Sequence, residues 1–278
     1  MIDPAATIPD NHFTATPFDL HDSDERGSLY NINQIVQAND LSVVFQPIVH
    51  IETLRVFAYE ALTRCRVKEY ANPTALFERA TSERCVGRLG RMVREVALPL
   101  CAGRPVFLNV HPAELDARWL VRPDDPMYFH DHDVFLEITE AVPFAQFELC
   151  RDVLREVRSR GNISLVVDDL GAGYSNLKHI VDLEPSLVKL DRGLVADVTL
   201  GSRQQRLITN IVRLCKDMGA QVVAEGVETV DEWRALRDTG VHFAQGFLFA
   251  RPGYPLPPVS VPPEIEDIQR SIRPPRRP

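Results

Sequence analysis

The sequence predicts an α/β fold, namely an irregular TIM-type (β/α)8 barrel whose first strand is antiparallel. Eight apolar segments have the length of strands, and after the first pair they alternate with amphipathic helical segments along the 278-residue chain. Residues 51–53 alone join the first two strands, which is too short for a parallel connection. Six strands end in a carboxylate or an amide, and a closed barrel gathers such ends at one rim.

The N-terminal part of the chain combines an arm with a hairpin. Residues 1–28 mix Pro, Asp, Thr and His without periodicity, so we expect a flexible arm there. A short helix is expected at 31–38, where apolar residues share one face. Residues 42–50 and 54–63 then form the two strands of the predicted hairpin.

Beyond the hairpin, strands and helices alternate. Helices are expected at 73–81, 85–101, 144–160, 176–181, 202–218 and 230–238, and strands at 105–110, 134–138, 163–168, 187–190, 221–225 and 242–247. The strands are largely apolar on both faces, as parallel strands covered by helices require. In the last long helix, Leu207, Ile208, Ile211, Val212 and Leu214 form a stripe that predicts core packing. An open doubly wound sheet is the alternative, but it would bind its ligand at one switch point and would not explain oxygens on six strand ends.

The barrel is expected over residues 29–252, and residues 253–278 are a proline-rich tail. The tail can dock along the barrel, bind a protein partner or stay disordered, and its composition favours disorder. At most one or two exposed helical turns are expected at 265–272.

Composition excludes several classes of protein. Apolar residues make up 45% of the chain and charged residues 25%, as in an ordinary globular protein. The net charge of −8 argues against a broad surface for DNA or an anionic membrane. Five scattered cysteines without a CxxC pair argue against a disulfide framework or a zinc knuckle. Because the sequence has no apolar leader or membrane-spanning run, a cytoplasmic location is expected.

The polar side chains at the strand ends point to a metal site. They are Glu60, Asn109, Glu137, Asp168 with Asp169, Asp191, and Glu225. So many carboxylates at one rim would repel one another unless cations lay among them. Oxygen ligands suit hard divalent ions, and two ions are the simplest number for this many ligands. Lys189 would be an ordinary salt-bridge lysine without metals, but its strand is otherwise apolar. His111 follows Asn109 by two positions, and a place in the pocket lining is the less favoured interpretation.

An ordered series of short motifs carries a resemblance to a known family. The motifs are Gln46-Pro47-Ile48, Glu60-Ala61-Leu62-Thr63-Arg64, Asn109, Glu137-Ile138-Thr139-Glu140, Asp168-Asp169-Leu170-Gly171, Lys189-Leu190-Asp191, Glu225-Gly226-Val227-Glu228 and Gln245-Gly246-Phe247. In this order, over about residues 31–252, the chain resembles the EAL domain family of bacterial cyclic di-GMP phosphodiesterases. The resemblance implies hydrolysis of one phosphodiester of cyclic di-GMP, which gives the linear dinucleotide pGpG.

The resemblance also implies a role for each matching residue. Glu60, Asn109, Glu137 and Asp168 would hold one Mg²⁺ or Mn²⁺ ion, and Asp168, Asp169 and Glu225 a second. Lys189 would orient or stabilise the attacking hydroxide, and Asp191 and Glu228 would assist as outer groups or bases. Glu140 would anchor the loop at 169–176. The residues that would line the dinucleotide are Gln46, Leu62, Arg64 and Gln245.

Alternatives within the same fold stay open. The chain could be a receptor or scaffold that binds cyclic di-GMP without turnover, but no ligand residue of the series is lost. It could also act on another cyclic dinucleotide. The segment between Arg64 and Asn109 is shorter than is typical of the family, which leaves one side of the pocket undefined. A homodimer is expected from the resemblance alone, and a protein partner could bind the arm or the tail.

Overall fold

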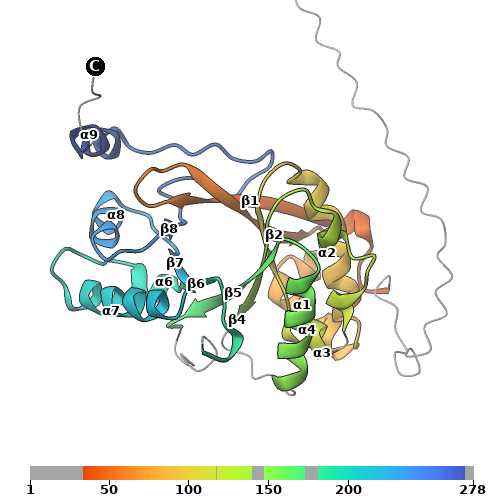
Figure 1. Cartoon of the computed structure of the whole chain (residues 1–278). Helices are drawn as coiled ribbons and strands as arrows, with labels where there is room; N and C mark the ends of the chain where they lie inside the picture. The colour runs from red at the N-terminus through yellow and green to blue at the C-terminus, as the bar shows by residue number, and fades with distance from the viewer. Residues whose placement is uncertain (1–33, 117, 140–146, 173–180, 273–278) are drawn as a thin grey trace, which may run out of the picture.

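A computed structural model of the chain describes residues 34–116, 118–139, 147–172 and 181–272 (Figure 1). In this part of the chain eight strands close into a barrel in sequence order. β1 (Leu41–His50) is antiparallel to both of its neighbours, β2 (Val56–Cys65) and β8 (Phe243–Ala244). All other neighbouring strands are parallel. The predicted fold class, including the antiparallel first strand, is therefore confirmed.

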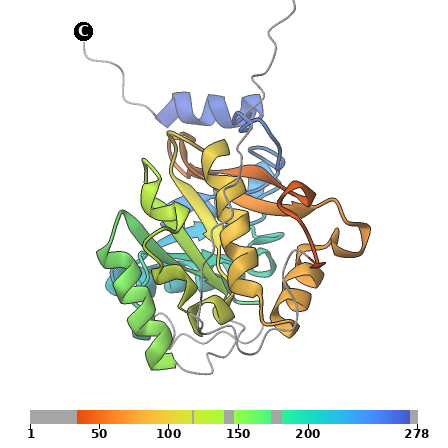
Figure 2. The ribbon, with the colours of Figure 1, turned by 90° about the vertical axis from the view of Figure 1, so that its right-hand side faces the viewer.

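The remaining elements follow the predicted alternation. The other strands are β3 (Val106–Asn109), β4 (Val134–Thr139), β5 (Ile163–Leu170), β6 (Leu187–Leu190) and β7 (Gln221–Ala224). The helices are α1 (Pro73–Ser82), α2 (Val86–Leu100), α3 (Pro112–Asp116), α4 (Phe147–Ser159), α6 (Arg192–Val195), α7 (Arg203–Asp217), α8 (Val230–Arg237) and α9 (Pro263–Ile272). Figure 2 shows the helices outside the strands, with α9 across one end of the molecule.

Side-chain caps fix where several helices begin. Asn72 accepts a hydrogen bond from the backbone of Thr74 at 3.1 Å and precedes Pro73, which suits the first turn of α1. Thr229 and Glu232 form a capping box at the start of α8, where each side chain accepts from the other residue's backbone amide. These local signals start the helices just after the strands that precede them, so the helix N-termini lie at the rim where the strands end.

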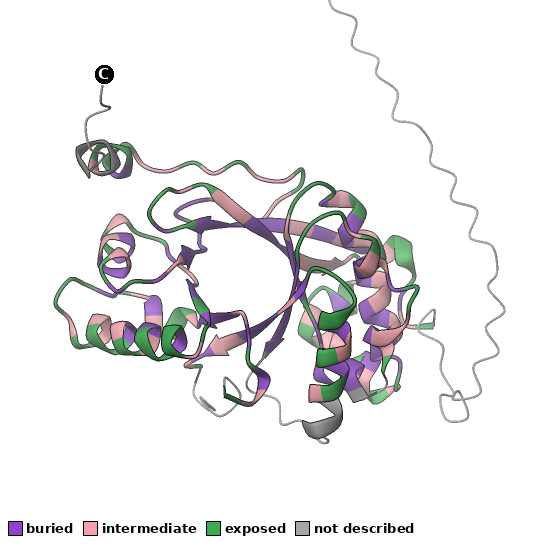
Figure 3. Ribbon diagram, viewed as in Figure 1, coloured by how far each residue is buried: buried purple, intermediate pink, exposed green. Residues whose placement is uncertain are grey.

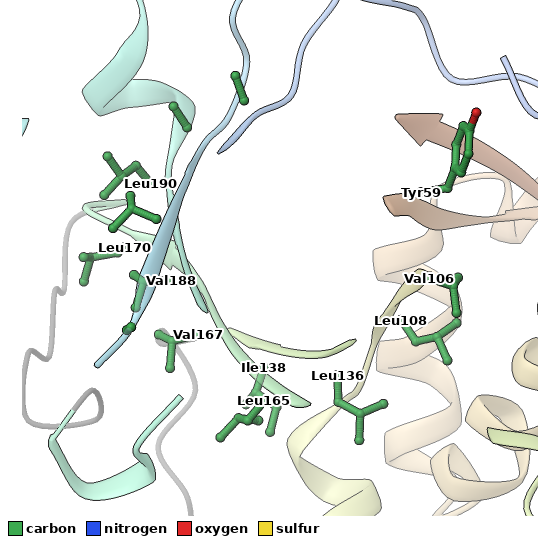
Figure 4. Close-up of a cluster of buried hydrophobic side chains, with 14 of the residues drawn as sticks. Tyr59, Val106, Leu108, Leu136, Ile138, Leu165, Val167, Leu170, Val188 and Leu190 are labelled. Carbon is green, nitrogen blue, oxygen red and sulfur yellow. The ribbon is translucent and has the colours of Figure 1, made fainter. Parts of the chain in front are cut away.

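Two apolar layers hold the barrel together. Outward-facing strand residues pack under the helices, and Figure 4 shows Leu108, Leu136, Val167 and Val188 among them. A second cluster fills the inside of the barrel: Ile48, Ala58, Phe107, Phe135, Val166, Leu187, Val223 and Phe243. Most of the length of the strands is accordingly buried (Figure 3). The inner cluster forms a floor beneath the rim where the polar strand ends lie.

Several expected boundaries differ from the structure. The last strand is Phe243–Ala244 rather than 242–247. Residues 36 and 37 are not helical, and a 3-10 turn occupies Ala38–Asp40 instead. In α7, Leu207 and Leu214 are 49% and 39% exposed, so the expectation of core packing is wrong for them. Only the face with Ile208, Val212 and Cys215 points at the barrel, because one helix face covers about three positions in seven.

The described part of the tail packs on the barrel. Gly253 and Phe45 exchange two backbone hydrogen bonds, of 2.8 and 2.9 Å, next to the short β8. The Tyr59 hydroxyl donates to the carbonyl of Pro257 at 3.3 Å, and Ile265 is fully buried. The β1–β2 hairpin has no crossover helix, so this segment covers its outer face instead. Docking, rather than the expected disorder, therefore describes residues 253–272.

Some expectations fall outside the described residues. These are the arm at 1–28, Glu140, most of the helix expected at 176–181, and residues 273–278.

Candidate active site

Strand geometry explains why the predicted polar residues meet. Alternate residues of a strand share a face, so the residue two positions beyond each inner-floor residue also points into the barrel. This places Glu60 above Ala58, Asn109 above Phe107, and Glu137 above Phe135. In the same way it places Asp168, Lys189, Glu225 and Gln245 above their own floor residues, and Gln46 joins them from the antiparallel β1. The rim is therefore one ring of polar side chains over one apolar floor.

Lys189 lies at the centre of this ring. Its ammonium is 2.5 Å from Glu225, 2.6 Å from Glu137, 3.3 Å from Asp168 and 3.6 Å from Glu60. The Lys189 side chain is only 1% exposed. One buried cation thus faces four carboxylates from four different strands, which leaves an excess of negative charge.

Amide side chains hold Glu60 in place. Gln245 donates to Glu60 Oε2 at 2.6 Å, and Asn109 donates to Oε1 at 3.3 Å. Gln245 also donates to the side chain of Gln46 at 3.2 Å, and Gln46 donates to the carbonyl of Ala250 at 3.0 Å. Three amide residues predicted as metal or substrate contacts therefore form one network with the first predicted metal ligand.

The excess charge perturbs the carboxyl groups. Burial, and next the charge of Glu60, raises the pKa of Glu137 well above its ordinary value. Burial also raises the pKa of Glu225 to about 8, although Lys189 opposes the shift. Burial acts on Glu60 as well, but Lys189 and the two amide donors outweigh it and lower the pKa of Glu60. Against the cost of its own burial, the surrounding acids raise the pKa of Lys189, so it stays a cation.

The oxygen set suits divalent cations. Glu137 Oε2 is buried without a hydrogen-bond partner among the described residues, and Oε1 has the Lys189 ammonium beside it at 2.6 Å. One oxygen from each of Asp168, Asp169 and Glu225 lies within 4.8 Å of the other two. Asp169 has a positive φ of 61°, and its amide donates to Asp168 at 2.9 Å. This local turn directs consecutive aspartates to one place, and hard ions such as Mg²⁺ or Mn²⁺ prefer such ligands.

The outer predicted residues lie at the edge of the ring. Asp191 accepts from the amide of Gly193 at 2.8 Å and caps the short α6. Glu228 pairs with Arg192 at 2.9 Å. The guanidinium of Arg64 donates to the carbonyl of Thr63 at 2.8 Å. Asp191 and Glu228 are therefore held by local contacts rather than by Lys189.

Two cavities flank the acids. The smaller, of about 180 Å³, is lined by Gln46, Glu60, Arg192, Glu225, Gly226, Glu228, Gln245, Gly246 and Phe247. The larger, of about 560 Å³, is lined by Leu62, Thr63, Arg64, Pro73, Thr74, Phe77, Glu78, Asn109, Val110, His111, Pro112, Glu137, Asp168 and Asp169. All four residues predicted to line the dinucleotide thus border one cavity or the other.

Sequence reasoning missed part of this lining. The sequence did not predict Phe77 or Glu78 as site residues, and it did not favour a place for His111 in the pocket lining. All three border the larger cavity. A signal was present, because a helix that follows a barrel strand begins at the rim with the site. The first turns of the helix after β2 were therefore predictable neighbours of the site.

A family model for the EAL domain matches residues 30–252. The chain belongs to the EAL domain family. Its relatives include the cyclic di-GMP phosphodiesterase RocR of Pseudomonas aeruginosa, 35% identical over 156 residues that cover 54% of this chain and 40% of RocR. The cyclic di-GMP phosphodiesterase PA2567 of the same organism is 30% identical over 77% of this chain and 38% of its own length. The chain thus spans less than half the length of these relatives.

Solved structures agree with the barrel. Klebsiella pneumoniae BlrP1 in a manganese and cyclic di-GMP complex is 31% identical, with a TM-score of 0.65 over 77% of this chain and 56% of that one. A standalone EAL protein from Vibrio cholerae, bound to cyclic di-GMP, is 27% identical, with a TM-score of 0.64 over 82% of this chain and 98% of that one. Within the residues that the structure describes, no helix is both long and apolar enough to cross a membrane.

Proposed function

We propose that this EAL domain is a metal-dependent phosphodiesterase that hydrolyses cyclic di-GMP to the linear dinucleotide pGpG. The observation that carries the proposal is the buried ring of carboxylates around Lys189, whose negative charge exceeds what one lysine can balance. Relatives named as cyclic di-GMP phosphodiesterases and the cyclic di-GMP complexes of similar barrels support it.

Two groups of residues would hold divalent ions. Glu60, Asn109, Glu137 and Asp168 would hold one ion, and Asp168, Asp169 and Glu225 the other, with Mg²⁺ or Mn²⁺ as the fitting metals. When bound, such ions supply positive charge to the phosphate and lower the pKa of a nearby water.

Lys189 acts as a fixed cation in this scheme. The surrounding acids raise its pKa, so in the metal-free ring it is a cation and a hydrogen-bond donor. Its N–H groups can donate to an attacking water or to a phosphate oxygen, which stabilises negative charge as it develops. Gln245 and Asn109 fix the carboxylate of Glu60 by hydrogen bonds, so that the ligand is oriented before substrate enters. Asp191 and Glu228 would assist from the edge of the ring.

The two cavities would take the two halves of the substrate. A cyclic dinucleotide carries a base on each side of its phosphodiester ring. Residues of β1 and residues just after β7 and β8 border the smaller cavity, and residues of β3, β4 and β5 border the larger one. Leu62 and Arg64 would contact the half in the larger cavity, and Gln46 and Gln245 the half in the smaller one.

Incubation of the purified protein with cyclic di-GMP and Mn²⁺, followed by chromatography, tests the proposal. We expect pGpG as the product. Glu60→Ala should yield almost no product, and Glu264→Ala, which changes an exposed glutamate of α9 outside the ring, is its matched control and should leave the product unchanged. Tight binding of cyclic di-GMP without any pGpG would instead make the protein a receptor. Homodimerisation and a cytoplasmic location stay predictions, and light scattering measures the first.

A further inference from the structure

The larger cavity contains a histidine that the metal-site roles do not use. His111 lies between Asn109 and α3, and it borders the cavity together with Phe77 from α1. The two rings are nearly parallel, with an interplanar angle of 13° and centroids 6.3 Å apart. Offset stacking of this kind fixes the plane of the imidazole against a second element of the fold.

The hydrogen bonds of His111 determine which ring nitrogen carries the proton. Its Nδ1 accepts from the backbone amide of Ala113 at 3.2 Å, so Nδ1 carries no proton. In the neutral ring the proton then sits on Nε2, across the ring from Nδ1. Nε2 makes no hydrogen bond to the described part of the chain. The ring therefore offers the cavity a hydrogen-bond donor whose position is set by two contacts.

The other polar side chains of this cavity define what such a donor can meet. Arg64 also offers donors only, while Glu78 offers a carboxylate acceptor. One edge of guanine carries the acceptors N7 and O6, and adenine carries an amino donor in place of O6. Arg64 and His111 are therefore two donors that fit the acceptor edge of guanine and oppose the amino group of adenine, while the Glu78 carboxylate can accept from the N2 amino group that guanine carries. The other carboxylates of this cavity, Glu137, Asp168 and Asp169, are assigned to the metal ions.

We propose that His111 is a substrate-binding residue that donates from Nε2 to the acceptor edge of the guanine in the larger cavity, with Phe77 holding its ring in position. The inference rests on the proposed function only in that the ligand is a cyclic dinucleotide. A role in capping α3 alone would explain Nδ1, but it would explain neither the stacked Phe77 nor the place of the ring in the cavity wall.

Two substitutions separate the two nitrogens. In His111→Asn, the side-chain oxygen can still accept from the Ala113 amide, but no group reaches the position of Nε2. In His111→Gln, the amide nitrogen reaches that position, but the contact with Ala113 is lost. His132→Asn is the matched control, because His132 is exposed in the loop before β4, at the opposite end of the barrel.

The experiment measures turnover of cyclic di-GMP, cyclic di-AMP and bis(p-nitrophenyl) phosphate, which has no base, and calorimetric binding of cyclic di-GMP with Ca²⁺. For His111→Asn we expect the KM and the Kd for cyclic di-GMP to rise by about three- to tenfold, the loss of one neutral hydrogen bond, with kcat nearly unchanged. For the other two substrates, kcat/KM should fall by less than about twofold, which the loss of a weak contact would explain. His111→Gln should recover part of the affinity, and His132→Asn should match the parent protein.

An unchanged KM and Kd in His111→Asn would overturn the inference, and so would an equal loss on all three substrates, which would indicate a structural role. The binding arm keeps the inference separate from the proposed function. If the parent protein binds cyclic di-GMP but does not cleave it, the proposed hydrolysis fails, while a weaker Kd in His111→Asn still supports the role of His111. If the parent protein does not bind cyclic di-GMP at all, both proposals fail.

Discussion

Two buried clusters of charge in this barrel have opposite designs. In one, Arg94 of α2 lies between Asp125 and Glu114. The guanidinium donates to both oxygens of Asp125 at 2.8 to 3.0 Å and to Glu114 at 2.8 Å. The remaining acceptor positions are also used, because the amide of Met127 donates to Asp125 and the amide of His111 donates to Glu114. This cluster satisfies its own groups.

In the ring around Lys189, by contrast, the charges and hydrogen bonds are not balanced. One ammonium faces four carboxylates, a buried oxygen of Glu137 has no hydrogen-bond partner in the described part of the chain, and the pKa values of Glu137 and Glu225 are raised. A buried charge that lacks a partner destabilises a fold, so such a ring is retained for something that binds there. Glu114 in the Arg94 cluster also has a pKa that burial raises, so burial, ion pairing and a raised pKa do not by themselves mark a functional site. The ring around Lys189 differs because four carboxylates converge on one ammonium and a buried oxygen of Glu137 lacks a hydrogen-bond partner among the described residues.

Removal of Glu60 should have the largest effect on activity. We expect Glu60→Ala to lower kcat/KM by about a thousandfold, because a metal ligand worth several kcal/mol to the transition state is lost. The unfolding temperature of the metal-free protein should fall only modestly, because the hydrogen bonds from Gln245 and Asn109 are lost while the excess of negative charge is reduced. Thermal denaturation without metal, next to turnover with Mn²⁺, checks both. A variant whose unfolding temperature falls strongly while its turnover is unchanged would contradict the contrast between the two clusters.

Removal of Arg94 should have the opposite profile. Arg94→Met leaves the carboxylates of Glu114 and Asp125 buried without a cation, which should cost about 3–5 kcal/mol of unfolding free energy. Arg91→Met on the same helix is the matched control, because Arg91 also pairs with two carboxylates, Glu95 and Asp124, but at the surface. The control should lose at most about 1 kcal/mol. Urea denaturation measures both, and equal losses would mean that burial does not distinguish the two arginines.

Metal binding by the ring around Lys189 should depend on pH. The cluster of Arg94, Asp125 and Glu114 should show no such dependence, because it is not expected to bind a metal. At pH 7 the metal-free Glu225 is largely protonated, because its pKa is raised to about 8. A bound cation must displace that proton, so metal affinity should rise by up to about tenfold per pH unit as Glu225 ionises. Displacement of a proton from Glu137, whose pKa is also raised, would make the rise steeper and extend it above pH 8. Calorimetry in two buffers with different ionisation enthalpies counts the released protons. A pH-independent affinity between pH 6 and 8 would contradict the assignment of Glu225.

The same shift predicts how the stability of the metal-free protein varies with pH. The pKa of Glu225 is higher in the folded protein than in the unfolded chain. Its contribution therefore favours the folded state fully below the unfolded pKa and is lost as pH rises toward about 8. Mn²⁺ should remove this dependence, and unfolding curves between pH 5 and 8 measure it. A loss of the same size with saturating Mn²⁺ would show that another group titrates.

Replacement of Mn²⁺ by Ca²⁺ should affect hydrolysis more than substrate binding. Ca²⁺ is larger and takes irregular coordination, so it should permit binding of cyclic di-GMP but inhibit its hydrolysis. Turnover in Ca²⁺ alone, measured against Mn²⁺ and against a mixture of both, checks this prediction. Full activity in Ca²⁺ would mean that hydrolysis does not require an ion with octahedral coordination.

The sequence predicted most of the barrel because its signals are local. A three-residue connection requires an antiparallel hairpin, and apolar strands that end in oxygens require one shared rim. The period of two then relates each polar residue to its floor residue, as for Phe135 and Glu137. The docked tail was not predictable in the same way, since its prolines favour disorder locally and its contact with Tyr59 joins distant parts of the chain.

The charged clusters were predictable to different degrees. The residues around Lys189 follow strands, so topology alone brings them together. Arg94, Glu114 and Asp125 lie on a helix, a short helix and a loop, and no strand pattern relates them. Their pairing depends on how the helices pack, which sequence periodicity does not specify. Phe77 was missed although a helix that follows a barrel strand begins at the rim, and His111, two positions after Asn109, was considered for the pocket lining but not favoured.

The most direct test is a count of bound Mn²⁺ by equilibrium dialysis, with the parent protein beside Asp168→Asn, which alters the aspartate assigned to both ions. We expect close to two ions per chain in the parent and clearly fewer in the variant. A parent protein that binds no Mn²⁺ up to millimolar concentration, or a variant that binds as many ions as the parent, would contradict it.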